Sequence, residues 1–135
     1  MTRYNTNLAA EFYVLSMLYR LGVDAALTLG NKKAVDIIVA NEDSTITTIE
    51  VKGLVKRYDW PADNIYEFQK PQHFYVLVTF DDKITDPLSP PSAWIIPATE
   101  MAQFMKEYKT RTVVSRAKVK EKGQDYLHAW SLIIG

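Results

Sequence analysis

Cysteine is absent from this chain of 135 residues, and histidine occurs only as His73 and His128. Without cysteine the protein has no disulfide, thiol nucleophile or cysteine-based zinc site. The two histidines lie far apart in the sequence and lack the spacing of metal ligands. We therefore expect each of them at the surface or at the edge of the core.

Long apolar runs are also absent, since none approaches the roughly 20 residues of a membrane-spanning helix. Near the N-terminus, Glu11 interrupts the apolar stretch after Arg3, and no small-residue cleavage site follows. This pattern predicts no signal peptide and favours a cytoplasmic protein. With 47% apolar and 24% charged residues, the composition is typical of a globular protein. The length predicts one domain, residues 1–135.

An excess of one charge is the third absence, because 16 Lys and Arg residues balance 16 Asp and Glu residues. The net charge of zero gives no support to a strongly basic nucleic-acid-binding protein. Locally, residues 106–122 are basic despite Glu107 and Glu121; their cations are Lys106, Lys109, Arg111, Arg116, Lys118, Lys120 and Lys122. This basic stripe could face phosphates, or it could be the solvated side of a helix end and a strand.

Hydrophobic periodicity and turn residues predict an α/β protein. A first helix is expected over residues 6–21, with Thr6 or Asn7 as its cap and Gly22 just past its end. Further helices are expected at 63–70, 98–108 and in the tail 123–135. Strands are expected at 24–29, 34–40, 45–52, 74–80, 93–97 and 112–119. This order predicts a mixed β-sheet flanked by helices.

Three charged residues, Asp36, Glu50 and Lys52, lie in predicted strands among Ile and Val residues. Side chains alternate along a strand, so Glu50 and Lys52 share one face. A hairpin with a five-residue loop at 41–45 would place Asp36 directly opposite Glu50. A loop with an even number of residues would put the two carboxylates on opposite faces, so the register decides whether they meet.

Two carboxylates that face each other across a ladder repel and destabilise the sheet unless something offsets their charge. Lys52 could do part of this, because it lies two residues from Glu50 on the same face. A divalent cation would do it better. Mg²⁺ favours one or two carboxylates together with waters and phosphate oxygens, which suits a pair of Asp36 and Glu50.

Glu11 is a third candidate carboxylate, on the first predicted helix. At about 100° per residue, the apolar face of this helix is expected to comprise Leu8, Phe12, Leu15, Leu18 and Tyr19. Glu11 would then project from that face toward the sheet, where a charge is costly unless it is paired or binds a metal. The alternative is that Glu11 lies at the margin of the face and reaches water or a lysine.

The order and spacing of these residues resemble the PD-(D/E)XK nuclease superfamily, which includes restriction endonucleases and Holliday-junction resolvases. Thirteen residues separate Asp36 from the run Glu50-Val51-Lys52, and the helix that bears Glu11 comes first. The resemblance covers about residues 5–80 and implies a restriction-endonuclease-like core of order αβββαβ. One departure is Val35, which stands where the superfamily motif has proline.

The resemblance implies a divalent-metal-dependent nuclease that hydrolyses phosphodiester bonds, with DNA as the expected nucleic acid. Asp36, Glu50 and the carbonyl group of Val51 would bind Mg²⁺, with Mn²⁺ as a substitute, and Glu11 would complete the site directly or through a water. Lys52 would position or activate the attacking water. Asp36, Glu50 and Lys52 are thus the expected catalytic residues.

Several alternatives remain open at the level of sequence. In the loop after the motif, Lys56 and Arg57 could contact phosphates while Tyr58 and Trp60 stack on an unpaired base; equally, Trp60 could be core and the cations solvated. The fold could serve as a binding, immunity or regulatory module without catalysis. The chain could also be an unrelated α/β domain in which Lys52 bridges two surface carboxylates. A homodimer, which would offer two sites to the two strands of a duplex, is compatible with the size.

Overall fold

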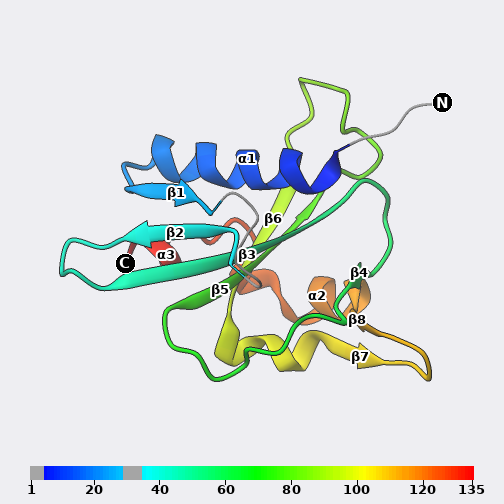
Figure 1. The fold of residues 1–135 in the computed structure, drawn as a ribbon. Helices are drawn as coiled ribbons and strands as arrows, with labels where there is room; N and C mark the ends of the chain where they lie inside the picture. The colour runs from blue at the N-terminus through cyan, green and yellow to red at the C-terminus, as the bar shows by residue number, and fades with distance from the viewer. Residues whose placement is uncertain (1–4, 29–34) are drawn as a thin grey trace.

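The computed structural model describes residues 5–28 and 35–135, and it has the predicted mixed α/β architecture (Figure 1). A five-stranded sheet has the strand order β1-β2-β3-β5-β6, and a three-stranded sheet has the order β4-β8-β7. In chain order the elements are α1 (Thr6–Arg20), β1 (Ala25–Leu27), β2 (Ile37–Ala40), β3 (Ile46–Leu54), β4 (Trp60–Pro61), β5 (His73–Thr79), β6 (Ser92–Pro97), the 3₁₀ helix η1 (Ala98–Phe104), β7 (Met105–Glu107), β8 (Thr112–Val114), α2 (Arg116–Lys122), the 3₁₀ helix η2 (Gln124–Tyr126) and α3 (Ser131–Ile134).

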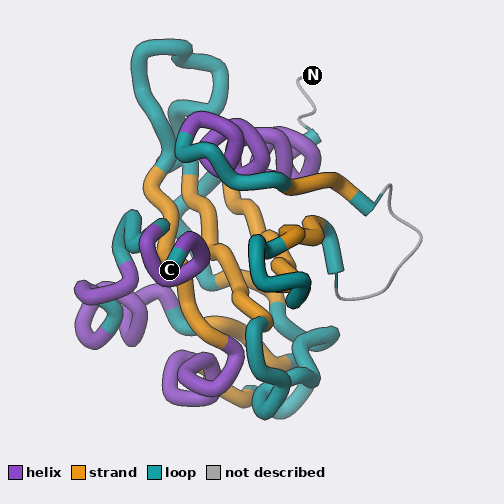
Figure 2. Tube along the Cα trace, turned by 90° about the vertical axis from the view of Figure 1, so that its left-hand side faces the viewer, coloured by secondary structure: helices purple, strands orange, loops and turns teal. Residues whose placement is uncertain are grey.

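The five-stranded sheet separates two hydrophobic cores. On one face, Ile49 and Val51 of β3 belong to the core that also contains Val14 of α1 and Trp130. On the other face, Tyr75 and Leu77 of β5 pack with residues of η1, β4, β8 and α2. Helix α3 lies on the α1 side, since its Ile133 belongs to the same core as Val14, whereas η1 and α2 cover the opposite face. Figure 2 shows the strands between the long helix α1 and the helical segments of that opposite face. Within the described ranges, no helix has the length and apolar character needed to cross a membrane.

Helix α1 has the predicted extent, but its cap is Asn5 rather than Thr6 or Asn7. The Asn5 side chain accepts a hydrogen bond from the backbone N–H of Leu8, which satisfies one of the unpaired donors of the first turn. Gly22 follows the helix with a φ of +80°, a left-handed conformation that glycine adopts without strain.

The predicted buried face of α1 is right only in part. Leu18 is buried and Leu15 packs against the core, as predicted. Leu8, Phe12 and Tyr19, however, are 43%, 54% and 57% exposed, and the other buried residues are Ala10 and Val14. The reason lies in β3, where a Cβ atom on Gly53 would stand only 2.7 Å from Cβ of Ala10. The small residues Ala10 and Gly53 let the helix pack closely on the strand. The packing gained by this close approach outweighs the burial of the larger apolar side chains Leu8, Phe12 and Tyr19.

The β2–β3 hairpin has the predicted register. Its strands end at Ala40 and begin again at Ile46, which leaves residues 41–45 as the loop, and Ile37 lies opposite Ile49. Strand β3 then pairs in parallel with β5, so that Glu50 lies opposite Tyr75 and Lys52 opposite Leu77. The outer ends of the first two predicted strands, at residues 29 and 34, and the turn between them lie outside the described residues.

Four other predicted elements need correction. Residues 63–70 form turns rather than a helix, so the connection from β3 to β5 lacks the second helix of the expected αβββαβ order. The predicted helix 98–108 is η1 followed by β7, and the predicted strand 112–119 is β8 followed by α2. Helix α2 begins there because the Ser115 side chain accepts a hydrogen bond from the N–H of Lys118. The tail 123–135, predicted as helix, contains only η2 and α3.

Candidate active site

Glu50 and Lys52 lie on the face of the main sheet that is turned away from α1. They alternate with Ile49 and Val51, which belong to the core beneath α1, so the two charged side chains point toward the opposite core. Glu50 is only 3% exposed, and the Lys52 side chain is 16% exposed. Strand β3 thus holds a carboxylate in the interior and a cation beside it.

The two carboxylate oxygens of Glu50 have different environments. Its Oε2 lies 2.8 Å from Nζ of Lys52, which also donates a hydrogen bond of 2.7 Å to Oδ1 of Asn64. Its Oε1 is buried and has no hydrogen-bond partner among the described residues. A buried, unsatisfied carboxylate oxygen is costly, so this atom marks a position suited to a cation, a proton or a water.

Asp36 is held at the end of the β2–β3 ladder, one residue before β2 begins. Its N–H donates to the carbonyl group of Ile49 at 2.8 Å, and its own carbonyl group accepts from the N–H of Thr28 at 3.0 Å. Its Oδ2 accepts a 2.7 Å hydrogen bond from the N–H of Val51. Asp36 therefore lies beside the backbone between Glu50 and Lys52, rather than inside a regular ladder opposite Glu50.

Glu11 lies at the margin of the buried face of α1, next to Ala10, and it is partly exposed. Burial raises the pKa of Glu11, and the negative charge of Asp36 raises it further. The carboxylate of Glu11 is thus close enough to Asp36 for their charges to interact. Glu11 lies on the α1 side of the sheet, whereas the side chain of Glu50 points to the opposite side.

The carboxylates of Asp36 and Glu50 are both harder to ionise than in water. Burial raises the pKa of Asp36, against hydrogen bonding from Val51 and the charge of Lys52. Burial also raises the pKa of Glu50; a hydrogen bond from Lys52 and the charge of Lys52 oppose this, and the charge of Asp36 adds to it. A bound divalent cation would favour the charged forms of these groups.

The structure therefore brings Asp36, Glu50 and Lys52 together around the backbone of Val51. Glu11 is linked to Asp36 through the effect of the Asp36 charge on the pKa of Glu11. Over residues 5–28 and 35–135, no three acidic or histidine side chains gather closely enough to form a preassembled metal cage. Mg²⁺ does not need such a cage, because it keeps several waters and uses one or two carboxylates. The open Oε1 of Glu50 and the neighbouring Asp36 fit that donor set.

Three residues near Glu50 belong to the surroundings of the site but were not predicted from the sequence: Asn64, Tyr75 and His73. Asn64 accepts a hydrogen bond from the ammonium group of Lys52 and so orients it. Burial, followed by the charge of Glu50, raises the pKa of Tyr75 to about 12, and its hydroxyl group donates to the carbonyl group of Glu67 at 2.9 Å. His73, expected at the surface or at the core edge, is 2% exposed. The alternation of β5, which puts His73 and Tyr75 on the face of Glu50, is the signal that could have found the last two.

His73 is locked into the sheet rather than presented to solvent. Its Nδ1 lies 2.7 Å from Oγ1 of Thr48, and its ring packs edge-on against Tyr75 at 4.9 Å. Its Nε2 is buried and has no hydrogen-bond partner in the described part of the chain. Burial lowers the pKa of His73, so the neutral form is favoured. The second histidine, His128, is exposed as expected.

A hollow of about 660 Å³ opens beside Lys52. Its walls come from the first residues of α1, the end of β3 and the segment that contains Trp60 and Asn64. We call it the Lys52 hollow. Trp60 itself is fully buried, and its Nε1 donates to the carbonyl group of Val78 at 3.1 Å, so Trp60 is a core residue and cannot stack on a base.

Comparisons with protein families, curated proteins and solved structures find no match to this chain.

Proposed function

We propose that this protein is a divalent-metal-dependent nuclease with a PD-(D/E)XK-type site. The observation that carries the proposal is the carboxylate of Glu50. One of its oxygens is paired with Lys52, and the other is buried without a hydrogen-bond partner in the described chain. The charge of Asp36 also acts on this carboxyl group and raises its pKa. A sheet interior does not retain such a group for stability alone, because a buried ion pair contributes little net stability.

Asp36 and Glu50 would hold the metal, Mg²⁺ or Mn²⁺, together with the carbonyl group of Val51. Glu11 would bind the metal from the α1 side of the sheet, directly or through a water. Carboxylate and carbonyl oxygens are the ligands that these cations prefer. The chemistry that such a metal would supply is polarisation of a phosphoryl oxygen and a lowered pKa of a bound water.

Lys52 supplies the fixed positive charge of the site. Glu50 and Asn64 hold its ammonium group at 2.8 Å and 2.7 Å, so the charge is already in place and costs little reorganisation during the reaction. The Lys52 hollow gives a phosphodiester access to this cation. Lys52 would orient the attacking water and stabilise the charge that develops on the phosphoryl group.

The proposed fold is a variant of the restriction-endonuclease-like core. Its support is the order of α1, the β2–β3 hairpin and the parallel pairing of β3 with β5. In this variant the helix expected between those parallel strands is replaced by β4 and turns. That replacement brings Asn64 to Lys52.

A cleavage assay tests the proposal. Wild-type protein, Glu50→Gln and Lys52→Ala are incubated with linear duplex, single-stranded DNA, branched DNA and RNA, in Mg²⁺, in Mn²⁺ and in EDTA. Lys56→Ala is the matched control, because Lys56 follows the motif but its side chain is 62% exposed. We expect metal-dependent cleavage by wild type and Lys56→Ala only. Cleavage that survives in Glu50→Gln would contradict the proposed site.

A second candidate function is a binding, immunity or regulatory module that retains the nuclease fold without catalysis. The internal pair of Lys52 and Glu50 favours it, since it neutralises the buried carboxylate without a metal. Metal binding separates the two functions. Isothermal titration with Mn²⁺ should show a site that Glu50→Gln and Asp36→Asn abolish if the protein is an enzyme, and no such site if it is a module of this kind.

A further inference from the structure

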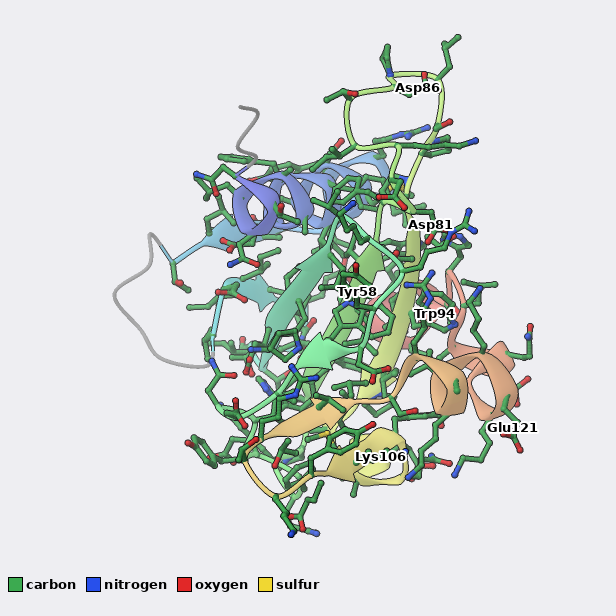
Figure 3. All side chains as sticks on the ribbon, turned by 90° about the vertical axis from the view of Figure 1, so that its right-hand side faces the viewer. Tyr58, Asp81, Asp86, Trp94, Lys106 and Glu121 are labelled. Carbon is green, nitrogen blue, oxygen red and sulfur yellow. The ribbon has the colours of Figure 1, made fainter. Side chains whose placement is uncertain are left out.

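Two basic segments that are distant in sequence lie on the side of the molecule where α1 begins. One is the loop after β3, with Arg57 and Tyr58, and the other is the hairpin formed by β7 and β8. Figure 1 shows the first turn of α1 and the tip of the hairpin on the same, right-hand side. Figure 3, which views the molecule from that side, shows both Tyr58 and Lys106.

A second hollow, of about 570 Å³, joins these segments. It is lined by Arg57 and Tyr58 of the loop and by Arg111 of the hairpin, together with Leu54, Asp59 and Pro61. We call it the Arg57 hollow. Leu54 and Pro61 also line the Lys52 hollow, so the two hollows adjoin and lead from the candidate active site to the hairpin. The volume is in the range of sites that hold a small ligand, and one nucleotide is of that size class.

The hairpin continues the cationic and aromatic lining. The N–H of Tyr108 donates to the carbonyl group of Arg111 at 2.8 Å, which fixes these two residues across from each other. The ring of Tyr108 has Nζ of Lys106 at 5.2 Å from its centroid and the guanidinium carbon of Arg111 at 5.9 Å. None of the ion pairs found in residues 5–28 and 35–135 involves Lys106 or Arg111. Both cations therefore keep their charge for an external anion.

The rings of this surface are accessible to a ligand. Tyr58 is 65% exposed and Tyr108 is 46% exposed, although a tyrosine usually buries most of its ring. Exposed rings interleaved with Lys and Arg are the pattern of surfaces that bind single strands, where bases stack and the backbone follows the cations.

The carboxylates of the same region are already engaged by backbone groups. Asp59 accepts a 2.9 Å hydrogen bond from the N–H of Arg116, and Asp63 accepts one of 2.7 Å from the N–H of Thr112. Arg57 makes one long contact, of 3.7 Å, with Asp81, and its side chain stays 66% exposed. Glu107, the last residue of β7, lies between Lys106 and Tyr108 in the sequence and so points to the other face of the hairpin.

We propose that the Arg57 hollow binds single-stranded nucleic acid together with the face of the β7–β8 hairpin that carries Lys106, Tyr108 and Arg111. The bound strand would extend from there to Lys52. An unpaired base stacks on Tyr58, and the flanking phosphates contact Arg57 and Arg111. A continuous duplex does not fit this role, because its base faces are covered by neighbouring pairs and cannot stack on a side chain. The assignment of substrate class rests on the proposed nuclease function, but the binding itself does not require the metal.

Fluorescence anisotropy in EDTA tests the proposal without cleavage. The probes are a fluorescein-labelled oligodeoxythymidylate and a blunt duplex of the same length. We expect wild type to bind the single strand more tightly than the duplex. Tyr58→Ala should weaken binding of the single strand about tenfold, and Tyr58→Phe should retain it. Arg111→Ala should weaken binding and reduce the slope of log K against log salt by about 0.7.

Two exposed residues away from the hollow serve as controls: Phe12→Ala, on the outer side of α1, and Lys70→Ala, just before β5, at the end of the β3–β5 ladder that is far from Leu54. Both should bind like wild type. Equal or tighter binding of the duplex, or unchanged binding by Tyr58→Ala and Arg111→Ala, would overturn the proposal.

The binding assay also separates this proposal from the nuclease proposal. Glu50→Gln should bind the oligodeoxythymidylate like wild type while it fails to cleave in Mg²⁺. If wild type cleaves while Tyr58→Ala and Arg111→Ala bind normally, the nuclease proposal is supported and binding at the Arg57 hollow is refuted. If both variants lose binding while wild type cleaves nothing in Mg²⁺ or Mn²⁺, binding at the Arg57 hollow is supported and the nuclease proposal is refuted.

Discussion

Nζ of Lys52 lies 2.8 Å from Oε2 of Glu50, and Oε1 of the same carboxylate is buried without a hydrogen-bond partner in residues 5–28 and 35–135. The carboxylate is thus neutralised on one side and open on the other. A further cation would stabilise this group. In the proposed function, Lys52 and a metal would act on Glu50 together, because they would use different oxygens.

The first prediction concerns stabilisation by metal. Mg²⁺ or Mn²⁺ at about ten times its dissociation constant should stabilise the wild type by about 1.4 kcal/mol, which for a chain of this size raises Tm by about 5 °C. Asp36→Asn and Glu50→Gln should lose most of this shift, while Glu42→Gln, on the exposed hairpin loop, should keep it. Differential scanning fluorimetry against metal concentration is the measurement. An equal shift in all four proteins would mean that the metal binds elsewhere.

The second prediction concerns pH. Burial raises the pKa values of Glu50 and Asp36 in the folded protein, so the folded state binds these protons more tightly than the unfolded chain does. Stability from these groups is therefore greatest in acid and falls as the pH rises through the raised pKa values. Glu50→Gln removes one of them. It should be more stable than wild type near neutral pH, and this advantage should vanish below about pH 4.

Urea unfolding of wild type and Glu50→Gln across this pH range checks the second prediction. A neutral-pH stability of Glu50→Gln below that of wild type would show that the pair with Lys52 outweighs the cost of burial. The same protons compete with a metal, so Mn²⁺ affinity should also fall as the pH is lowered toward the raised pKa values.

The relative positions of Asp36, Glu50 and Lys52 could be predicted from the sequence, because loop length and strand alternation determine them. The five-residue loop 41–45 sets the register of the hairpin, and alternation along β3 sets the shared face of Glu50 and Lys52. The buried face of α1 could not be predicted in this way, because two stripes compete and only the contact of Ala10 with Gly53 decides between them. The role of Asn64 was also hidden, since it depends on how a segment without regular structure crosses from β3 to β5.

The third prediction tests the close packing of α1 on β3. Gly53→Ala would place a methyl group 2.7 Å from Cβ of Ala10 and 3.2 Å from the carbonyl oxygen of Thr6. The helix must then move away from the strand, and we expect the free energy of unfolding to fall by about 1–3 kcal/mol. Activity should fall as well, because Gly53 adjoins Lys52 and lines the Lys52 hollow.

Ala10→Gly tests whether the loss in Gly53→Ala comes from the contact with Ala10. On its own, Ala10→Gly should lower the free energy of unfolding by about 1 kcal/mol, because glycine is unfavourable within a helix. Combined with Gly53→Ala it removes the nearest contact, so the double variant should be more stable than the sum of the two losses predicts. Strict additivity in urea unfolding would show that the contact between Ala10 and Gly53 is not the source of the strain.

The fourth prediction separates the structural role of Lys52 from its chemical role. Lys52→Met leaves Glu50 buried without its cation, and the loss of one partner from a buried pair is costly. We expect a loss of about 3 kcal/mol near neutral pH. Adding Glu50→Gln should recover most of the loss, because the remaining side chain is neutral. Lys56→Met, which breaks an exposed pair with Asp82, should change stability by less than about 1 kcal/mol.

The double variant Glu50→Gln, Lys52→Met should therefore be folded and stable but inactive, and it should not bind Mn²⁺. This combination matters because each single variant could lose activity through partial unfolding, whereas the double variant could not. Circular dichroism and urea unfolding report its fold, and the cleavage assay reports its activity. Metal-dependent cleavage by a stable double variant would place the chemistry away from β3.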